Sequence, residues 1–427
     1  MGKGNVIVGQ SGGPTAVINS SLAGVFKTAM ERDYNKVYGM QYGILGFLDE
    51  MYVDLSDYIK NELDLELLKR TPSAFLGTCR YKLPEIHEDK AVYERIFELL
   101  NKLDIDVFIY IGGNDSMDTI KKLSDYALLT GEKQKFVGCP KTIDNDLAIT
   151  DHTPGYGSAA KYIATSTKEI IRDAMGFSFK KKNVTIMEIM GRNAGWLVGS
   201  TALCRQEDCD GPDLIYLPEV PFDLDSFVTK VENILKKKDV VVIAVSEGIK
   251  TKEGKYVTEL AQATAKKDAF GHIQMTGTAA YLANLINEKL GVKTRAVELS
   301  SLQRSAAHFS SKIDVDEAFA VGGATVKAAD EGSTGVMVVI ERMSDDPYQS
   351  ATSVFDVHRI ANDEKVVPRE WINKEGDNVT DEFVDYVYPL IQGSYAPVMV
   401  EGLPRHLVME IKPRKNRKRS HEIKFER

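Results

Sequence analysis

Two short polar runs, each directly after an apolar stretch typical of a buried strand, hold most of the residues that can do chemistry. Residues 112–116 (GGNDS) follow VFIYI, and residues 140–146 (PKTIDND) follow KFVGC. The first run offers a glycine pair whose backbone N–H groups are open to an anion, and the second places a lysine beside two carboxylates. Phosphoryl transfer requires cations that spread charge on the moving group, a carboxylate that accepts a hydroxyl proton, and a carboxylate near magnesium. The two runs together predict a phosphoryl-transfer site.

The run PKTIDND carries the strongest prediction. Asp144 and Asp146 alternate along the chain, so in an extended turn both side chains project to one side. Lys141 is close enough in sequence to favour the ionised form of both carboxylates. A charged surface loop without a function is the alternative. Because the run lies at the exposed end of an apolar strand, where loops often carry function, we favour a functional loop.

Two glycine loops have the same placement after a strand. Gly12 and Gly13 follow NVIVG and open a helix, so an anion at the helix N-terminus and a tight structural turn are both compatible with them. In GGNDS, one of Asn114, Asp115 and Ser116 is also expected to cap the helix that follows. A carboxylate at Asp115 would repel any additional phosphate of a donor, which suggests selection among donors.

Other strand ends carry residues suited to a sugar phosphate. Residues 190–192 (MGR) combine a flexible side chain, a bare backbone and a guanidinium, although an ordinary salt bridge is equally compatible. Glu188 lies inside an apolar strand and needs a partner, for which Arg192 is a candidate. Glu247 ends another strand and suits sugar hydroxyls. Three further arginines are candidates only if the fold brings them together, and they are Arg80, Arg295 and Arg304. His272 and His308 are interpreted as packing or surface residues.

The elements that must position these residues alternate along the chain. β-branched apolar runs end at glycine or polar turns and are followed by helical patterns, which predicts parallel sheets covered on both faces and a doubly wound α/β fold. In such sheets ligands bind outside the carboxyl ends of the strands, so the site is expected to assemble from distant segments. The helix over residues 17–31 is expected to turn Asn19, Lys27 and Glu31 to solvent. From residue 345 the pattern loosens into an extension wrapped on the main body.

Composition bounds the class of protein. The 427 residues, 43% of them hydrophobic, are enough for two or three domains. A net charge of −8 argues against a nucleic-acid binder, and the basic cluster at residues 412–419 is interpreted as a solvated tail. The four cysteines match no metal or redox motif, which favours reduced thiols and a cytoplasmic location. The sequence predicts neither a secretory signal nor a membrane span.

The order of the motifs resembles that of the phosphofructokinases. SGGP, GTCR at residues 77–80, GGNDS, PKTIDND, MGR, SEG and TRAVELSSLQR follow one another at the family's rough spacing, through about residue 330. The resemblance implies two doubly wound, mostly parallel α/β domains with a C-terminal extension. Residues 1–155 would form a phosphoryl-donor domain completed by about 304–350, residues 156–303 a fructose 6-phosphate domain, and residues 351–427 the extension.

The resemblance also implies an activity and a set of site residues. The activity is Mg²⁺-dependent transfer of a phosphoryl group to the 1-hydroxyl of fructose 6-phosphate, a reaction of glycolysis. Asp144 matches the proton acceptor, Asp146 the neighbouring carboxylate near the metal, and Lys141 a third catalytic residue. Asn114 stands with Asp146 on the metal side. The donor side comprises Gly12, Arg80, Gly113, Asp115 and Lys141, and the sugar side Thr142, Asp144, Met190, Gly191, Arg192, Glu247, Arg295, Ser301 and Arg304.

Two positions favour pyrophosphate as the donor. ATP-using members of the family carry glycine where this chain has Asp115 and Lys141, and the pair resembles the pyrophosphate-using branch. Asp115 would repel the α-phosphate of a nucleotide, and Lys141 would stabilise charge on pyrophosphate oxygens. Because pyrophosphate is a lower-energy donor than ATP, the reaction is expected to be nearly reversible.

Three departures from the family and three alternatives stay open. Asn114 replaces an aspartate associated with magnesium, Ser301 a histidine near the 6-phosphate, and Asn183 an arginine that reaches across a subunit interface. The expected assembly is a homodimer or homotetramer. The alternatives are an ATP-dependent 6-phosphofructokinase, a kinase of the NAD-kinase-like group, which PKTIDND disfavours, and a non-catalytic regulatory subunit that binds sugar phosphate.

Overall fold

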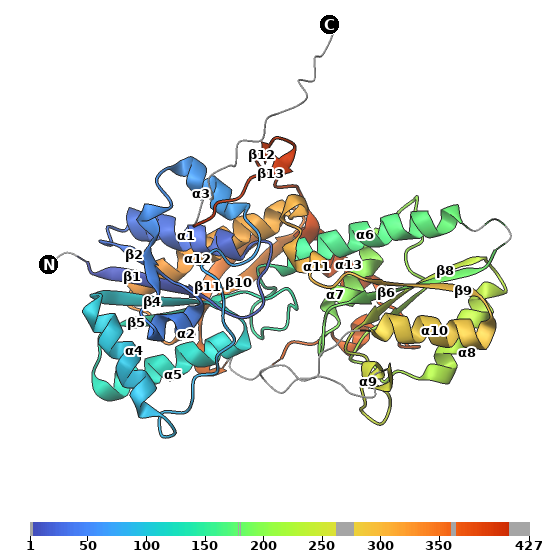
Figure 1. Cartoon of the computed structure of the whole chain (residues 1–427), viewed down its shortest axis with the longest axis horizontal. Helices are drawn as coiled ribbons and strands as arrows, with labels where there is room; N and C mark the ends of the chain where they lie inside the picture. The colour runs from blue at the N-terminus through green and yellow to red at the C-terminus, as the bar shows by residue number, and fades with distance from the viewer. Residues whose placement is uncertain (1–2, 178, 180, 262–276, 360–363, 410–427) are drawn as a thin grey trace, which may run out of the picture.

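The chain folds into two α/β halves that lie side by side (Figure 1). The computed structural model describes residues 3–177, 179, 181–261, 277–359 and 364–409. The predicted basic tail and His272 lie outside these residues. None of the helices in the described part of the chain is long and apolar enough to cross a membrane.

The first half is built on a seven-stranded sheet with the order β11-β10-β5-β4-β1-β2-β3. The strands β1, β2, β4, β5 and β10 run parallel, and the outer strands β3 and β11 pair antiparallel with their neighbours. Buried central strands of this kind require apolar residues on both faces, which explains the continuous apolar runs of the sequence. The strand bounds are β1 Asn5–Gln10, β2 Val37–Met40, β3 Tyr52–Asp54, β4 Ile105–Gly112, β5 Lys135–Pro140, β10 Val336–Asp345 and β11 Tyr348–Asp356.

The second half is built on a four-stranded, wholly parallel sheet with the order β7-β8-β6-β9. Its strands are β6 Asn183–Ile189, β7 Leu214–Tyr216, β8 Val240–Ser246 and β9 Lys293–Glu298. The predicted fold class, two doubly wound and mostly parallel α/β halves with an extension, is therefore confirmed. A short hairpin of β12 Met399–Val400 and β13 Leu403–Pro404 lies near the end of the described residues.

Helices cover both sheets (Figure 1). Those of the first half are α1 Ile18–Glu31, α2 Gly43–Leu48, α3 Glu62–Lys69, α4 Lys90–Lys102, α5 Asn114–Thr130 and α12 Lys312–Asp330. Those that follow the crossing to the second half are α6 Tyr156–Gly176, α7 Trp196–Gly199, α8 Leu224–Leu235, α9 Val257–Ala261, α10 Thr278–Leu290 and α11 Leu302–Ser305, and the extension adds α13 Asp381–Val387. Short 3-10 helices lie at Leu55–Asp57, Ser200–Cys204, Ala307–Phe309, Val357–Arg359, Arg369–Trp371 and Tyr388–Ile391.

The prediction that Asn19 faces solvent is wrong. Its side chain is fully buried, accepts hydrogen bonds from Gln10 Nε2 at 2.8 Å and Phe75 N at 2.9 Å, and donates to Thr71 O at 2.8 Å. The helical period placed Asn19 on the outer face, but the segment before the GTCR run covers this part of α1. A buried amide with these three partners pays no desolvation cost for an unmade bond.

The sheets also show where the halves begin and end. Helix α6 begins at Tyr156, next to the predicted division at residue 155, but strand β11 continues the first sheet to Asp356. The predicted start of the extension at residue 351 therefore cuts a strand, because the antiparallel β10–β11 hairpin was not recognised in the loosened pattern. The middle of the extension packs on the second half, where the ring of Phe383 stacks on that of Trp196 with centroids 5.9 Å apart. Its later residues return to the first half, where Leu407 N donates to Thr71 Oγ1 at 2.9 Å.

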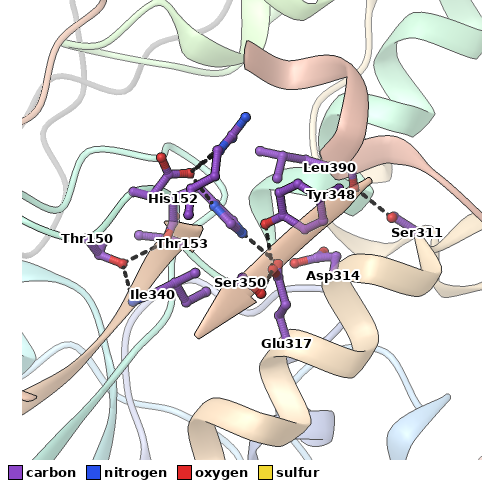
Figure 2. Close-up of polar contacts among 12 residues, drawn as sticks. Thr150, His152, Thr153, Ser311, Asp314, Glu317, Ile340, Tyr348, Ser350 and Leu390 are labelled. Carbon is purple, nitrogen blue, oxygen red and sulfur yellow. Dashed lines mark hydrogen bonds and ion pairs between the residues drawn. The ribbon is translucent and has the colours of Figure 1, made fainter. Parts of the chain in front are cut away.

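A buried ionic network holds the crossing between the halves. His152 lies in the loop between β5 and α6, with Nδ1 2.8 Å from Asp151 Oδ1 and Nε2 2.6 Å from Glu317 Oε2 of α12. Glu317 also accepts hydrogen bonds from Tyr348 and Ser350 of β11, both at 2.6 Å (Figure 2). Although burial alone lowers the pKa of an imidazole, the two carboxylates outweigh it and raise the pKa of His152 to about 9. His152 is therefore an imidazolium at neutral pH.

Glu317→Gln should destabilise the fold and change its dependence on pH. Removal of one partner of a buried ion pair costs about 3–5 kcal/mol of unfolding free energy. In the wild type, the stability that comes from the raised pKa of His152 is present below the ordinary pKa of about 6.5 and is lost as the pH rises through about 9. Chemical denaturation between pH 6 and 10 should show this decline, and a shallower one in the variant. Exposed Glu375→Gln is the control, and equal curves for both variants would contradict the prediction.

Candidate active site

A cleft of about 630 Å³ opens where the carboxyl ends of strands from both sheets face one another. The loops after β1, β4 and β5 come from adjacent strands of the first sheet, and those after β6 and β8 from adjacent strands of the second. The topology thus brings together segments that are far apart in sequence. The predicted site residues that line the cleft are Gly12, Arg80, Gly113, Asn114, Asp115, Lys141, Thr142, Asp144, Asp146, Met190, Arg192, Glu247 and Arg304.

Lys141 joins the three loops of the first half. Its backbone N–H donates to Gly112 O at 3.0 Å, and its buried ammonium donates to Gly13 O at 2.8 Å. Burial lowers the pKa of Lys141 to about 8, against the opposing effect of the carboxylates of Asp144 and Asp146. The ammonium is therefore still mostly charged at neutral pH, and it is placed at the bottom of the cleft.

The two carboxylates of PKTIDND do not behave as predicted from Lys141 alone. Burial is the largest influence on both and raises the pKa of Asp144, although Lys141 and the guanidinium groups of Arg304 and Arg192 oppose the rise. Burial and the charge of Asp144 raise the pKa of Asp146 to about 7. The expected bias from Lys141 toward ionisation is present but is outweighed by burial. Asp144 is held by its own turn, where its backbone N–H donates to Thr142 Oγ1 at 3.1 Å.

Helix α5 begins at the cleft without a side-chain cap, on the side predicted to bind the phosphoryl donor. Gly113 occupies the N-cap position, so the prediction that Asn114, Asp115 or Ser116 caps the helix is wrong. The helix begins at least one residue earlier than the prediction assumed, so Asn114, Asp115 and Ser116 all lie inside its first turn. The N-terminal end of α5 therefore faces the cleft with its partial positive charge, where it favours an anion. Asp115 is exposed in that turn and places a negative charge at the rim.

Asn114 and Asp146 fit a hard divalent cation. Asn114 Oδ1 is buried without a hydrogen-bond partner, although it lines a polar cleft, and Asp146 adds a carboxylate to the same cleft. The described residues contain no group of three or more histidine, cysteine, aspartate or glutamate side chains that could enclose a metal. Mg²⁺ is usually bound by only one or two protein oxygens, and substrate and water oxygens complete its coordination.

The side of the cleft for which the sequence predicted sugar-phosphate contacts depends on a tight turn after β6. Gly191 has φ +129°, and a Cβ there would lie 2.6 Å from Ala194 O, so the turn requires glycine. Ser246 Oγ donates to Gly191 O at 2.5 Å, and the N–H of Met190 donates to Gln303 Oε1 at 3.3 Å. Gly191 itself does not line the cleft, but it directs its two neighbours into it.

Two glutamates stand behind this turn. Glu188 accepts a hydrogen bond from Ala279 N at 2.8 Å, so its partner in the structure is the N-terminus of helix α10 and not the predicted guanidinium. Burial raises the pKa of Glu188 to about 7 despite that bond. Burial, followed by the charges of Asp144 and Glu188, raises the pKa of Glu247 to about 8. A protonated Glu247 can donate a hydrogen bond to a ligand as well as accept one.

Arg295 and Ser301 do not reach the cleft of their own chain. Arg295 lies three residues before the carboxyl end of edge strand β9, where it is exposed, pairs with Asp173 at 3.3 Å and lies over the ring of Phe177. It lines a separate hollow of about 370 Å³ together with Lys181, Lys182, Asn183 and Lys293. Ser301 is exposed at the start of α11. The scattered arginines are therefore only partly assembled, with Arg80 and Arg304 inside the cleft and Arg295 outside.

Some residues of the cleft were not predicted. Tyr256 follows β8 at a distance, and Glu364 belongs to the extension, where it accepts a hydrogen bond from Asn193 Nδ2 at 2.8 Å. Nothing in the sequence around Glu364 marks it as part of a site. The other residues of the cleft were covered only as parts of the runs SGGP, GTCR, GGNDS and PKTIDND, where Gly13 was already considered for an anion, or they directly follow GTCR or MGR. They are Ser11, Gly13, Pro14, Cys79, Tyr81, Ser116, Ile143, Asn193 and Ala194.

Comparisons with known proteins agree with this geometry. The family described as phosphofructokinase matches residues 5–309. A pyrophosphate--fructose 6-phosphate 1-phosphotransferase of Xanthomonas campestris pv. campestris is 42% identical over 412 residues, which cover 96% of this chain and 97% of the relative. A protein of the same name from Halomonas elongata is 40% identical over 95% of this chain and 96% of its own length.

Solved structures give the same result. A crystal structure described as pyrophosphate-dependent phosphofructokinase from Nitrosospira multiformis is 36% identical and superposes with a TM-score of 0.85, covering 97% of this chain and 98% of that one. Fold and cleft define an α/β phosphotransferase whose site lies between two sheets. The chain belongs to the phosphofructokinase family.

Gly191→Ala should weaken the sugar side of the cleft. An alanine at this φ is strained by about 1–3 kcal/mol, and its Cβ pushes the Met190 and Arg192 side chains out of place. We expect the KM for the sugar phosphate to rise at least about tenfold, which corresponds to about 1.4 kcal/mol. Steady-state kinetics measures this change. Gly176→Ala, where no atom lies within 4 Å of the added Cβ, is the control and should leave the KM unchanged.

Proposed function

We infer that this protein transfers a phosphoryl group from pyrophosphate to the 1-hydroxyl of fructose 6-phosphate and forms fructose 1,6-bisphosphate, as the names of its relatives state for them. One observation of the structure supports this inference most strongly. Lys141, which replaces the glycine of ATP-using relatives, is buried in the cleft between Gly13 and the carboxylates of Asp144 and Asp146. An ammonium at that place can bind the phosphate oxygens of pyrophosphate, a donor that carries negative charge and no nucleoside.

Asp144 is the proposed general base. It accepts the proton of the 1-hydroxyl as that oxygen attacks the nearer phosphorus of pyrophosphate. A new O–P bond forms, the bridging P–O bond breaks in line with it, and inorganic phosphate leaves. Lys141, Arg80, Arg192 and Arg304 line the same cleft and would stabilise the charge on the transferring and leaving oxygens. Thr142 holds the turn that presents Asp144.

Mg²⁺ is the proposed metal, with Asn114 and Asp146 as its protein ligands. When bound, it neutralises charge on the pyrophosphate oxygens. The buried and unpartnered Asn114 Oδ1 supports this assignment. An amide is a weaker ligand than the aspartate found in relatives, so Asp146 would provide the only charged ligand of the pair.

The assembly and the location are also proposals. Arg295 and Asn183 line the same hollow, and the family resemblance relates Asn183 to an arginine that crosses a subunit interface. We therefore propose a homodimer or homotetramer in which Arg295 serves the cleft of a neighbouring copy, with Ser301 beside it. Fructose 6-phosphate is a metabolite of the cytoplasm, which is the proposed place of action. Activity of the purified single chain would exclude the alternative of a regulatory subunit.

Asp144→Asn should remove most of the turnover. Loss of a general base lowers kcat by at least ~10², and the KM for fructose 6-phosphate should change little because the amide keeps the size of the side chain. A coupled assay for fructose 1,6-bisphosphate measures both constants. Exposed Asp210→Asn is the control, and near-normal turnover of Asp144→Asn would reject the role of base.

Asp115→Gly should admit ATP. The wild type is expected to use pyrophosphate and to reject ATP, because the carboxylate of Asp115 repels an additional phosphate. The variant, with or without a change at Lys141, should gain measurable activity with ATP in the same assay. Asp115→Asn removes the charge at nearly constant size, so it separates repulsion from bulk. A wild type that prefers ATP would make the donor argument wrong and would favour an ATP-dependent 6-phosphofructokinase.

A further inference from the structure

A four-residue segment of the C-terminal extension, residues 364–367, begins at the cleft and is hydrogen-bonded to both halves of the chain. The N–H of Lys365 donates to Asp146 O at 2.8 Å, and its carbonyl accepts a hydrogen bond from Trp196 Nε1 at 2.9 Å. Two residues later, Val367 N donates to Glu219 Oε1 at 2.9 Å, which also accepts from Gly195 N at 2.8 Å. Residues 364–367 thus connect the PKTIDND loop with the segment that follows the MGR turn.

The ammonium of Lys365 points into the continuation of the PKTIDND loop. It donates to Asp151 O at 2.5 Å and lies 3.3 Å from both Thr150 O and Asn145 Oδ1. The same ammonium lies 5.3 Å from the centre of the Trp196 ring. An ammonium that is removed from water needs such hydrogen-bond partners. If the side chain of residue 365 only filled space, an apolar side chain would do so at a lower desolvation cost.

Asn145 is the residue through which this ammonium reaches the catalytic groups. It lies between Asp144 and Asp146, is fully buried, and has φ +54°, a left-handed conformation that is costly for most side chains. Its Nδ2 donates to Tyr386 Oη at 3.1 Å, and its Oδ1 accepts from Thr153 N at 3.1 Å. Two of the groups that hold Asn145, the ammonium of Lys365 and the hydroxyl of Tyr386, come from the extension.

Tyr386 holds the same loop at a second point. Its hydroxyl donates to Asp151 O at 2.6 Å, so Asp151 O receives both Lys365 and Tyr386. The left-handed turn at Asn145 decides in which direction the carboxylates on either side of it project. The side chains that stabilise this turn therefore determine where the base stands relative to the reacting hydroxyl.

We propose that Lys365 of the C-terminal extension is a positioning residue of the active site, which acts with Tyr386 through Asn145 to hold Asp144 and Asp146 in their working orientation. This inference rests on the proposed phosphoryl transfer and adds a part of the chain that none of the motifs covers. A displacement of about 1 Å at a reacting group can cost 10²-fold in rate. Loss of Lys365 should consequently lower kcat more than it changes substrate binding.

The test compares Lys365→Met with Lys374→Met in the full-length chain. Methionine keeps the length and apolar volume of the side chain and removes its charge, and Lys374 is an exposed lysine of the same extension. With pyrophosphate and fructose 6-phosphate, we expect kcat of Lys365→Met to fall about 10- to 100-fold. The KM for fructose 6-phosphate should change by less than about threefold, and Lys374→Met should match the wild type.

Tyr386→Phe and Lys365→Ala keep the test decisive if Lys365→Met folds poorly, and a double variant adds a measure of coupling. Tyr386→Phe removes only the hydroxyl and should lower kcat with little change in KM, and the double variant should lose less than the product of the two single effects because both act through Asn145. Lys365→Ala should regain turnover when propylamine, the chemical equivalent of the removed atoms, is added to the assay.

The outcomes separate this inference from the proposed function. A wild type without phosphotransfer from pyrophosphate would overturn both. An active wild type whose Lys365→Met and Tyr386→Phe variants keep normal kcat would overturn the positioning role alone, even if their melting temperatures fall. Independent, fully multiplicative losses in the double variant, or no rescue by propylamine, would also count against it.

Discussion

The cleft depends on one buried cation, the ammonium of Lys141, which must keep its hydrogen-bond and charged partners. The ammonium of Lys141 donates to Gly13 O at 2.8 Å and stands beside the carboxylates of Asp144 and Asp146. If the loops after β1, β4 and β5 were not held at adjacent strand ends, this charge would be buried without partners, at a cost of several kcal/mol. The parallel order of these strands is therefore a condition for the chemistry as well as for the fold.

The electrostatics of the cleft follow from the balance between burial and charge. Burial raises the pKa of Asp144, Asp146 and Glu247, and the surrounding guanidinium groups only partly oppose the effect on Asp144. Binding of anionic substrates and of a divalent cation adds new charges to this balance. Asp115 is exposed at the rim, outside the buried part, so its proposed role in donor selection is separate from that of the proposed base.

The two halves are joined by more than the crossing chain segments. The imidazolium of His152 connects the loop between β5 and α6 with Glu317 of α12, and Glu317 in turn binds Tyr348 and Ser350 of β11 (Figure 2). On the other side of the same loop, Lys365 and Tyr386 of the extension bind Asp151 O. The segment that carries the proposed catalytic carboxylates, Asp144 and Asp146, is thus held both by the first sheet and by the extension, which limits the movement of the proposed base.

Local sequence was sufficient to predict most of the buried parallel strands, the α/β class with two sheets and most of the cleft, because strand burial and glycine turns are encoded by neighbouring residues. It missed the outer strand β11. GGNDS, PKTIDND and MGR were placed at strand ends, and those strand ends do meet in one cleft. Local pattern failed where contacts join distant segments. Asn19 is buried by a segment more than fifty residues away, and Arg295 sits too early in β9 to reach the strand end.

The extension shows most clearly what only the tertiary structure decided. Lys365 and Asn145 are separated by 220 residues, and the residues next to each in sequence do not predict their contact. The sequence by itself determined which residues can carry charge, accept a proton and form each strand. Packing determined which of them meet, because the direction of a side chain depends on the sheet order and on the segments that cover it, and these are set by contacts over the whole chain.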